Sequence, residues 1–281
     1  MCKLRAAIWL IMAMAAAPAF AQEDTVNSFA LSVCQDPGNL PFSDEAGEGF
    51  ENRIAALMAQ RIGLPLQVYW YPQRMNVVRN TIRYKLPGQS YYRCDLLTGV
   101  PAEWGPVLTT EPYYRSTYVL IYAKDLRLDV DSGEAFLQLD RVKLSKLKIG
   151  IFDRTPASMW LTKHGLLDQA VPYRVMNADP SYYPGRIVEK DLADGVIDVA
   201  VVWGPIGGYF AQRVKKRDLV VIPLQSEPGV RFDYPIAMGV RHGEPKWRNR
   251  VQGLLDALQP EIDRILRDYG VPLVSKGGKP R

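Results

Sequence analysis

The side chains that could carry acid–base or nucleophilic chemistry are few in this sequence. Its two histidines are His164 and His242. His164 precedes Gly165 at the expected end of a helix, where a cation interacts favourably with the helix dipole, and His242 is expected in a turn. The sequence contains no H-E-x-x-H, G-x-S-x-G, Walker or dinucleotide-binding motif. We therefore expect no catalytic residue and no metal site.

Aromatic and charged side chains gather instead where predicted strands end or where the chain is expected to cross between sheets. Aromatic rings at such positions give a binding cleft a large contact area with a polar tip. The set expected to line a cleft or contact a partner is Asp36, Asn39, Phe42, Glu51, Trp70, Arg74, Tyr113, Tyr114, Arg115, Asp153, Arg154 and Trp203. An alternative stays open for part of this set, in which Arg115 pairs with a nearby carboxylate while Tyr113 and Tyr114 pack in a hinge.

These side chains depend on the elements that precede them. Leu31–Cys34 is predicted as a strand, Asp36–Pro41 as a loop and Phe50–Arg61 as a helix. This order is half of a βαβ unit, and ligands or partners of open α/β sheets bind outside the carboxyl ends of the strands. Further strands are predicted at 66–70, 95–100, 113–122, 148–152, 173–176, 198–203, 219–222 and 235–240, and helices at 75–84, 132–146, 155–161, 184–194, 204–210 and 245–269. The alternation predicts a doubly wound, mostly parallel sheet.

Several stretches of the chain carry a family resemblance. They are Val33–Pro37, Asn39–Ser43, Gly47–Asn52, Tyr71–Arg74, Arg79–Thr81, Cys94–Pro101 and Thr109–Tyr118. They resemble the periplasmic solute-binding proteins of family 3, and most of all the quinoprotein-dehydrogenase-associated branch of methanol oxidation, MoxJ or MxaJ with its sister group XoxJ. The resemblance covers nearly the whole chain after its start. It implies a two-lobed α/β fold of the type II periplasmic-binding-protein class, each lobe a sheet flanked by helices.

The resemblance also implies a function. A member of this branch is expected to be a non-catalytic periplasmic accessory protein that assists assembly or activation of a PQQ-dependent methanol dehydrogenase, or loads its cofactor. The quinone would then belong to the partner enzyme, and no cofactor is expected to stay bound to this chain. The alternative is a receptor that delivers a small solute to an ABC transporter.

The anchors that amino-acid-binding members of the superfamily use are missing. Those members typically carry a T-x-x-R element after the third strand, whose Arg pairs with the ligand carboxylate, and an Asp after the buried strand of the second lobe. Gly99–Trp104 and Trp203–Pro205 stand at these places. Asp153–Pro156 replaces the G-G-T loop of the second lobe. We therefore expect a roomier or more apolar groove that does not bind free amino acids.

The predicted domain organisation begins with a targeting segment. Lys3 and Arg5 precede an apolar run, and Ala19–Ala21 matches an A-x-A cleavage signal, so cleavage is expected near Ala21 and export to the periplasm. Residues 22–122 are expected to form the first part of lobe one, 123–224 lobe two, and 225–281 the return to lobe one. No later stretch approaches about 18 consecutive apolar residues, so no membrane anchor is expected.

The formal net charge is +5 and the pI is about 9.0. A basic balance is typical of proteins that meet nucleic acid, a membrane surface or an acidic protein, and export argues against nucleic acid. The charges are dispersed along the sequence, and the tight run Lys215–Arg217 is interpreted as a solvated turn before a strand.

Cys34 and Cys94 remain after the expected cleavage. An oxidising compartment favours a disulfide between them. However, Cys34 ends its predicted strand and Cys94 starts one, so in parallel neighbours the two Cα atoms would lie beyond the limit of about 7 Å for a bridge. A shifted register, or an irregular segment at Tyr91–Arg93, would bring them together. A disulfide and two buried thiols are both left open.

Overall fold

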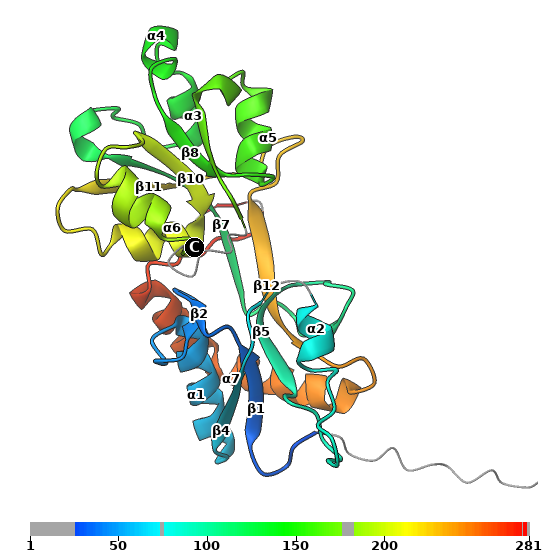
Figure 1. The fold of residues 1–281 in the computed structure, drawn as a ribbon. Coiled ribbons are helices and arrows are strands. Elements are labelled where there is room, and N and C mark those ends of the chain that lie inside the picture. Colours follow the sequence, from blue (N-terminus) through cyan, green and yellow to red (C-terminus); the bar gives the residue numbers. More distant parts are fainter. Residues whose placement is uncertain (1–25, 74–75, 176–182, 277, 280–281) are drawn as a thin grey trace, which may run out of the picture.

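The computed structural model describes residues 26–73, 76–175, 183–276 and 278–279. They form two lobes that are joined by long strands, as Figure 1 shows with one lobe above the other. The targeting segment predicted at Met1–Ala21 lies outside the described residues. Among the described residues, no helix combines the length and the apolar character that crossing a membrane requires.

The first lobe is built on a sheet whose strands run in the order β4 (Leu66–Trp70), β1 (Leu31–Gln35), β5 (Leu96–Pro101) and β12 (Asp233–Val240). The first three are parallel, β12 is antiparallel to β5, and the short β6 (Leu108–Thr109) pairs with the end of β12. All five residues of β1 are buried. A strand inside a parallel sheet is covered on both faces, and here the burial includes the polar side chains of Ser32 and Gln35.

Two amphipathic helices cover this sheet. Helix α1 (Phe50–Ile62) buries Phe50, Ile54 and Met58 at helical spacing and ends at Gly63. Helix α7 (Pro245–Asp268) buries the series Trp247, Val251, Leu255, Leu258, Ile262 and Leu266 and packs beside α1. The short helix α2 (Val77–Asn80) lies on the other side of the lobe (Figure 1), and the small strands β2 (Gly38–Asn39) and β3 (Ser43–Asp44) form a hairpin before α1.

The second lobe repeats the plan. Its parallel strands are β9 (Ala170–Tyr173), β8 (Ile149–Phe152) and β10 (Val199–Trp203), and β11 (Leu219–Pro223) is antiparallel to β7. Its helices are α3 (Gly133–Leu137), α4 (Arg141–Leu144), α5 (Pro156–Lys163) and α6 (Gly204–Ala211), with a π-helix at Ile187–Leu192 and 3-10 turns at Lys124–Leu126 and Leu167–Gln169.

Strand β7 (Tyr114–Ala123) connects the two sheets. Its residues Tyr114–Thr117 pair with β12 of the first lobe, and its residues from Tyr118 onward pair with β10 and β11 of the second. Figure 1 shows β7 and β12 side by side between the lobes. The two-lobed α/β fold that the resemblance implied is therefore the fold of this chain. The residue boundaries given above for the lobes stay a prediction.

Four predicted elements differ from the structure. The helix expected at 184–194 is a π-helix over Ile187–Leu192. The helix expected at 132–146 is interrupted, because the Asp140 carboxylate accepts hydrogen bonds from the backbone N–H groups of Val142 and Lys143, at 2.9 and 3.1 Å, and starts a new helix there. The strand expected at 173–176 lies at Ala170–Tyr173, where it pairs with all four residues of β8. Within the described residues, the helix expected at 75–84 is reduced to α2.

Cys34 and Cys94 form a disulfide, with their Cα atoms 5.6 Å apart. The expectation that the two cysteines lie at opposite ends of the sheet is wrong. Leu97, not Cys94, is the β5 residue opposite Cys34, and β5 begins only at Leu96, so the residues before it leave the strand direction. Of the two alternatives, a disulfide and two buried thiols, the structure has the disulfide. The irregular segment that would bring the two cysteines together lies before β5.

Candidate functional site

The loops that follow β1 and β4 are tied together by Asp36. Its carboxylate accepts hydrogen bonds from the backbone N–H groups of Gly38, at 3.1 Å, and Gln73, at 2.7 Å. The Ser43 hydroxyl bonds both backbone groups of Asp36. Asp36 thus fixes the shape of the carboxyl edge of the first sheet, and its carboxylate is engaged within the protein.

The other predicted site residues of this edge are partly covered. Asn39 lies in β2, Phe42 packs edge-on against Phe50 with ring centroids 5.4 Å apart, and Trp70 ends β4 opposite Gln35. Asn39, Phe42 and Trp70 are half-buried. Arg74 lies outside the residues that the structure describes.

Beneath these loops lies a buried carboxyl group, that of Glu51. The Tyr113 hydroxyl donates a hydrogen bond to its Oε1, and the backbone N–H of Gly99 donates to the same hydroxyl at 3.2 Å. Gly99 has a φ of 66°, and a side chain there would begin 3.3 Å from Oε1 of Glu51, so glycine suits both the backbone and the space. Burial raises the pKa of Glu51 to about 8, against the opposing effect of the bond from Tyr113.

The side chains of Glu51, Tyr113, Gln35 and Asn52 form what we call the Glu51 cluster. Two buried polar atoms of this cluster lack hydrogen-bond partners among the described residues. They are Oε2 of Glu51 and Nε2 of Gln35. Asn52 links the rest of the cluster, because its Nδ2 donates to Oε1 of Gln35 at 2.7 Å and its Oδ1 accepts from Gly49 N–H at 3.0 Å. Asn52 and Gln35 were not predicted as site residues, although a polar residue that ends a buried strand was a signal for Gln35.

The residues predicted at the first crossover lie inside the protein. Tyr113 and Tyr114 are 2% and 3% exposed. Nη1 of Arg115 lies 2.7 Å from Oδ2 of Asp233, across the paired strands β7 and β12. The structure therefore shows, for these three residues, the packing and pairing that the alternative interpretation described, and their contact with a partner stays a prediction.

Trp203 belongs to an aromatic cluster on the crossover strands. It ends β10 opposite Tyr118 of β7, with ring centroids 5.6 Å apart, and lies 5.9 Å from the ring of Tyr234 on β12. The Arg231 guanidinium lies over the same Tyr234 ring, 4.8 Å from its centroid. Trp203 and Tyr234 are half-buried, so part of each ring remains open to contact.

Asp153 and Arg154 follow β8 and point to different surroundings. The Asp153 carboxylate accepts a hydrogen bond from the backbone N–H of Val175 at 3.0 Å. The Arg154 side chain is 84% exposed and approaches Asp153 only to 3.8 Å. Its backbone has a φ of 55°, a left-handed conformation that is uncommon outside glycine. The two residues form a surface turn that is separate from the Glu51 cluster.

A contact that the sequence did not reveal joins the lobes. The rings of Tyr209, on α6 of the second lobe, and Tyr269, after α7 of the first, stack with centroids 5.5 Å apart and 13° between planes. Behind them, a side chain at Gly208 would begin 1.9 Å from the carbonyl oxygen of Gly270. The lobes therefore share a continuous buried core at this boundary. The pair Gly207–Gly208 before Tyr209 was the one sequence signal of such close packing.

The predicted residues thus form separate groups in the structure. Asp36, Phe42, Glu51, Tyr113 and Tyr114 belong to the first lobe and its crossover, Trp203 to the aromatic cluster, and Asp153 and Arg154 to a turn of the second lobe. Both histidines have structural partners: Nε2 of His164 lies 2.8 Å from Glu227, and Nε2 of His242 donates to the carbonyl oxygen of Gly105 at 2.9 Å. Within the described ranges, no group of three or more metal-ligating side chains is found.

The chain is similar to proteins of one family. It is 30% identical to the protein MoxJ of Methylorubrum extorquens, over 96% of this chain and 93% of that protein. The crystal structure of the periplasmic binding protein XoxJ from Methylobacterium extorquens is 34% identical, with a TM-score of 0.69 over 88% of this chain and 100% of that one. The structure of MxaJ from Methlophaga aminisulfidivorans, 21% identical, has the same fold, with a TM-score of 0.72 over 87% and 100% of the two chains. No protein-family model matches the chain.

Proposed function

The chain belongs to the MoxJ family of periplasmic binding proteins associated with methanol oxidation, and from that membership we propose that it is a non-catalytic accessory protein of a PQQ-dependent methanol dehydrogenase. It would act by contact with the enzyme, helping to assemble it, to activate it or to load its quinone. The observation that carries the proposal is the similarity to MoxJ over nearly the full length of both chains.

The side chains at the carboxyl edges of the sheets support an accessory role. The residues that follow β5 offer no arginine to a ligand carboxylate, and Trp203 stands where amino-acid receptors typically place an aspartate. Asp36 is engaged by backbone groups, and Arg115 is engaged by Asp233. Apart from Arg154, whose side chain is 84% exposed, the charged groups on which a receptor for a small charged solute depends are therefore absent or occupied in the described part of these edges.

The lobe boundary gives a second argument. A receptor that closes on its solute needs lobes that move about a hinge. Here the Tyr209–Tyr269 stack and the close approach of Gly208 to Gly270 hold the lobes through a shared core. Interiors of this kind resist continuous deformation, because they are packed as densely as organic crystals. A fixed relation between the lobes suits a protein that presents a surface to a partner.

The proposed location is the periplasm, because XoxJ is itself described as a periplasmic binding protein and the sequence begins with a predicted signal peptide. The quinone would be held by the dehydrogenase, and we propose no stably bound cofactor for this chain. The alternative, a receptor for an ABC transporter, shares the fold and predicts instead a small solute that stabilises the protein.

The proposal is tested by deleting the gene and measuring methanol oxidation per unit of dehydrogenase protein in cell extracts. The expected result is a loss of specific activity that the wild-type gene restores. Unchanged specific activity, with unchanged quinone content of the purified enzyme, would contradict the proposal.

A further inference from the structure

One segment of the chain carries positive charge without any negative charge. Between Glu51 and Asp95 the sequence contains seven Arg and Lys residues and no Asp or Glu. The whole chain has a formal net charge of +5, so this segment of +7 leaves −2 for all the rest. The net positive charge of the protein therefore comes from one part of the first lobe. The charges looked dispersed along the sequence because the positive residues of this segment are not adjacent to one another.

The structure brings three of these cations to one place. Arg79 of α2, with Arg83 and Lys85 just after it, lines a surface hollow of about 360 Å³ together with Asn76, Asn80 and Tyr84. Arg79, Arg83 and Lys85 are exposed. Among the described residues, none of the three forms an ion pair with a carboxylate; Arg83 donates to the carbonyl oxygen of Pro106 at 2.6 Å. We call these three residues and Tyr84 the α2 patch.

Tyr84 of the α2 patch packs against a further arginine, Arg93. The Arg93 guanidinium lies between two aromatic rings, 3.7 Å from the centroid of Tyr84 and 4.7 Å from that of Tyr69. Its Nη1 also donates to the Tyr69 hydroxyl. Arg93 lies one residue before Cys94, which is held by the disulfide to Cys34. Tyr84 is thus in contact with Arg93, whose backbone N–H also donates to the Tyr84 carbonyl oxygen at 3.0 Å, and a fourth positive charge adds to the potential of the patch.

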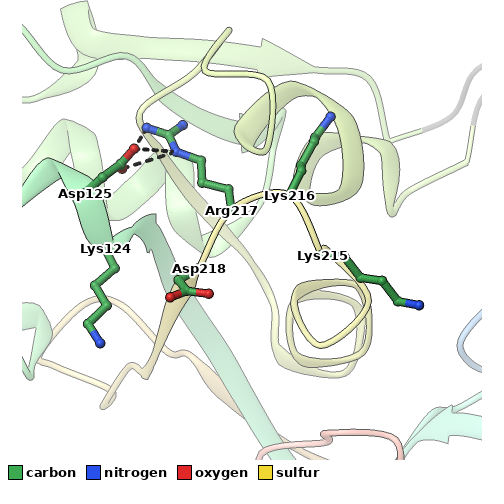
Figure 2. Close-up of a pocket in the computed structure, with 6 residues that line it drawn as sticks. All are labelled: Lys124, Asp125, Lys215, Lys216, Arg217 and Asp218. Carbon is green, nitrogen blue, oxygen red and sulfur yellow. Dashed lines mark hydrogen bonds and ion pairs between the residues drawn. The ribbon is translucent and has the colours of Figure 1, made fainter.

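A second basic hollow, on the second lobe, is partly neutralised by carboxylates of the protein itself. It is lined by Lys124, Asp125, Lys215, Lys216, Arg217 and Asp218. Arg217 forms a bidentate pair with Asp125, with Nη2 and Oδ1 2.9 Å apart, and Lys216 pairs with Asp194. Figure 2 shows the three lysine side chains pointing away from one another. The carboxylates here belong to the protein itself, whereas the α2 patch has no such partner in the described residues.

We propose that the α2 patch is the docking site for a carboxylate-rich surface of a protein partner. The inference rests on the proposed function, which supplies a partner protein, and it adds the face that meets it. Guanidinium groups bind carboxylates in a bidentate geometry, and Arg and Tyr are enriched among the residues that dominate interface energies. The patch combines both residue types around one hollow.

The geometry favours a protein over a small anion or a lipid surface. Arg79, Arg83 and Lys85 are all exposed, whereas a site for a small ligand buries most of that ligand's surface. Membrane binding by basic segments combines cations with apolar side chains that enter the lipid, whereas Asn76, Asn80 and Tyr84 line this hollow. An acidic protein surface fits polar and aromatic side chains between positive charges.

The test measures binding of purified methanol dehydrogenase from the same organism to the immobilised mature protein, at low and at physiological ionic strength. The patch variant is R79Q/R83Q/K85Q. The matched control is K124Q/K215Q/K216Q, which removes the same charge from the second lobe. A further variant, R79K/R83K, keeps the charge and removes the bidentate geometry. Circular dichroism and the unfolding midpoint show that each variant is folded.

The wild type is expected to bind with an association rate that falls as salt rises. The patch variant should associate about tenfold more slowly at low salt, and the control should change by less than about twofold. R79K/R83K should associate like the wild type and dissociate faster.

If the patch variant and the control behave alike while the wild type binds the dehydrogenase, the inference is wrong and the proposed function stands. If the wild type does not bind the dehydrogenase, both are wrong. Binding to vesicles that contain anionic lipid is measured in parallel. If the patch variant loses only the vesicle binding and keeps the binding to the dehydrogenase, the patch is a membrane site and the inference is wrong.

Discussion

The Tyr113 hydroxyl donates a hydrogen bond to the Glu51 carboxyl group, and no cation among the described residues forms an ion pair with that group. Tyr113 starts the chain's passage out of the first lobe, and Glu51 lies in the first turn of α1. The pair therefore couples the helix behind the carboxyl edge to the crossover strand. Because the pKa of Glu51 is raised to about 8, the carboxyl group is neutral at pH 7 and the pair is a bond between two uncharged groups.

This pair predicts how stability depends on pH. The pKa of Glu51 is about 8 in the folded state and 4.5 when unperturbed, so the folded protein binds more protons between these values. The free energy of unfolding should therefore fall as pH rises from about 4.5 to 8, by at most about 5 kcal/mol from this group. In Glu51→Gln this contribution disappears. Denaturant unfolding at pH 5, 7 and 9 measures it, and parallel pH curves for the two proteins would contradict the assignment.

The stack at the lobe boundary predicts the effect of removing one ring. Tyr209 and Tyr269 are 5% and 4% exposed, so Tyr269→Ala leaves a cavity and should lower the free energy of unfolding by about 3 kcal/mol. Tyr269→Phe keeps the ring and loses only the hydrogen bond that its hydroxyl donates to the carbonyl oxygen of Glu48, which costs about 1 kcal/mol. Equal losses in the two variants, measured by denaturant unfolding, would show that the stack itself does not join the lobes.

The ion pair between the crossover strands separates a structural role of Arg115 from a binding role. The Arg115 and Asp233 side chains are 20% and 7% exposed, so Arg115→Gln leaves a mostly buried carboxylate with less compensation. We expect the free energy of unfolding to fall by about 2 kcal/mol. Binding of the dehydrogenase by the folded variant should be unchanged. If the variant is as stable as the wild type but no longer binds the dehydrogenase, Arg115 is instead a residue that contacts the partner.

The absent amino-acid anchors predict the outcome of a ligand screen. A ligand that binds only the folded protein, at about 100 times its dissociation constant, raises the free energy of unfolding by about 2.7 kcal/mol. A thermal-shift screen of the standard amino acids should show no upward shift of the unfolding midpoint. A clear shift with any of them would favour the transport-receptor alternative.

Local patterns in the sequence predicted much of the fold. The apolar run of β1 and the helical spacing in α1 and α7 are set by burial against one sheet, so they can be recognised from neighbouring residues alone. Asp140 shows the limit, because its capping bonds to Val142 and Lys143 compete with a continuous helix and a periodic pattern does not reveal them. The distance between Cys34 and Cys94 depended on how the chain turns before Leu96, which strand prediction does not determine.

The candidate site was less predictable because its contacts join distant residues. Glu51 and Tyr113 are 62 positions apart, and Arg115 and Asp233 are 118 apart. The position of each residue at a strand end could be recognised, but whether its side chain faces a groove or the interior depends on the register of β7 against β12. Tyr209 and Tyr269 were missed for the same reason, since neither follows a motif.

The most direct test of the accessory role adds the purified protein to methanol dehydrogenase isolated from a strain that lacks its gene, and measures methanol oxidation with an artificial electron acceptor. If the protein acts on the enzyme by contact, activity should rise on addition of the wild type together with PQQ, and should not rise with PQQ alone or with heat-denatured protein. No rise in activity, with an enzyme that already has its full quinone content and oxidises methanol at the wild-type rate, would contradict the account.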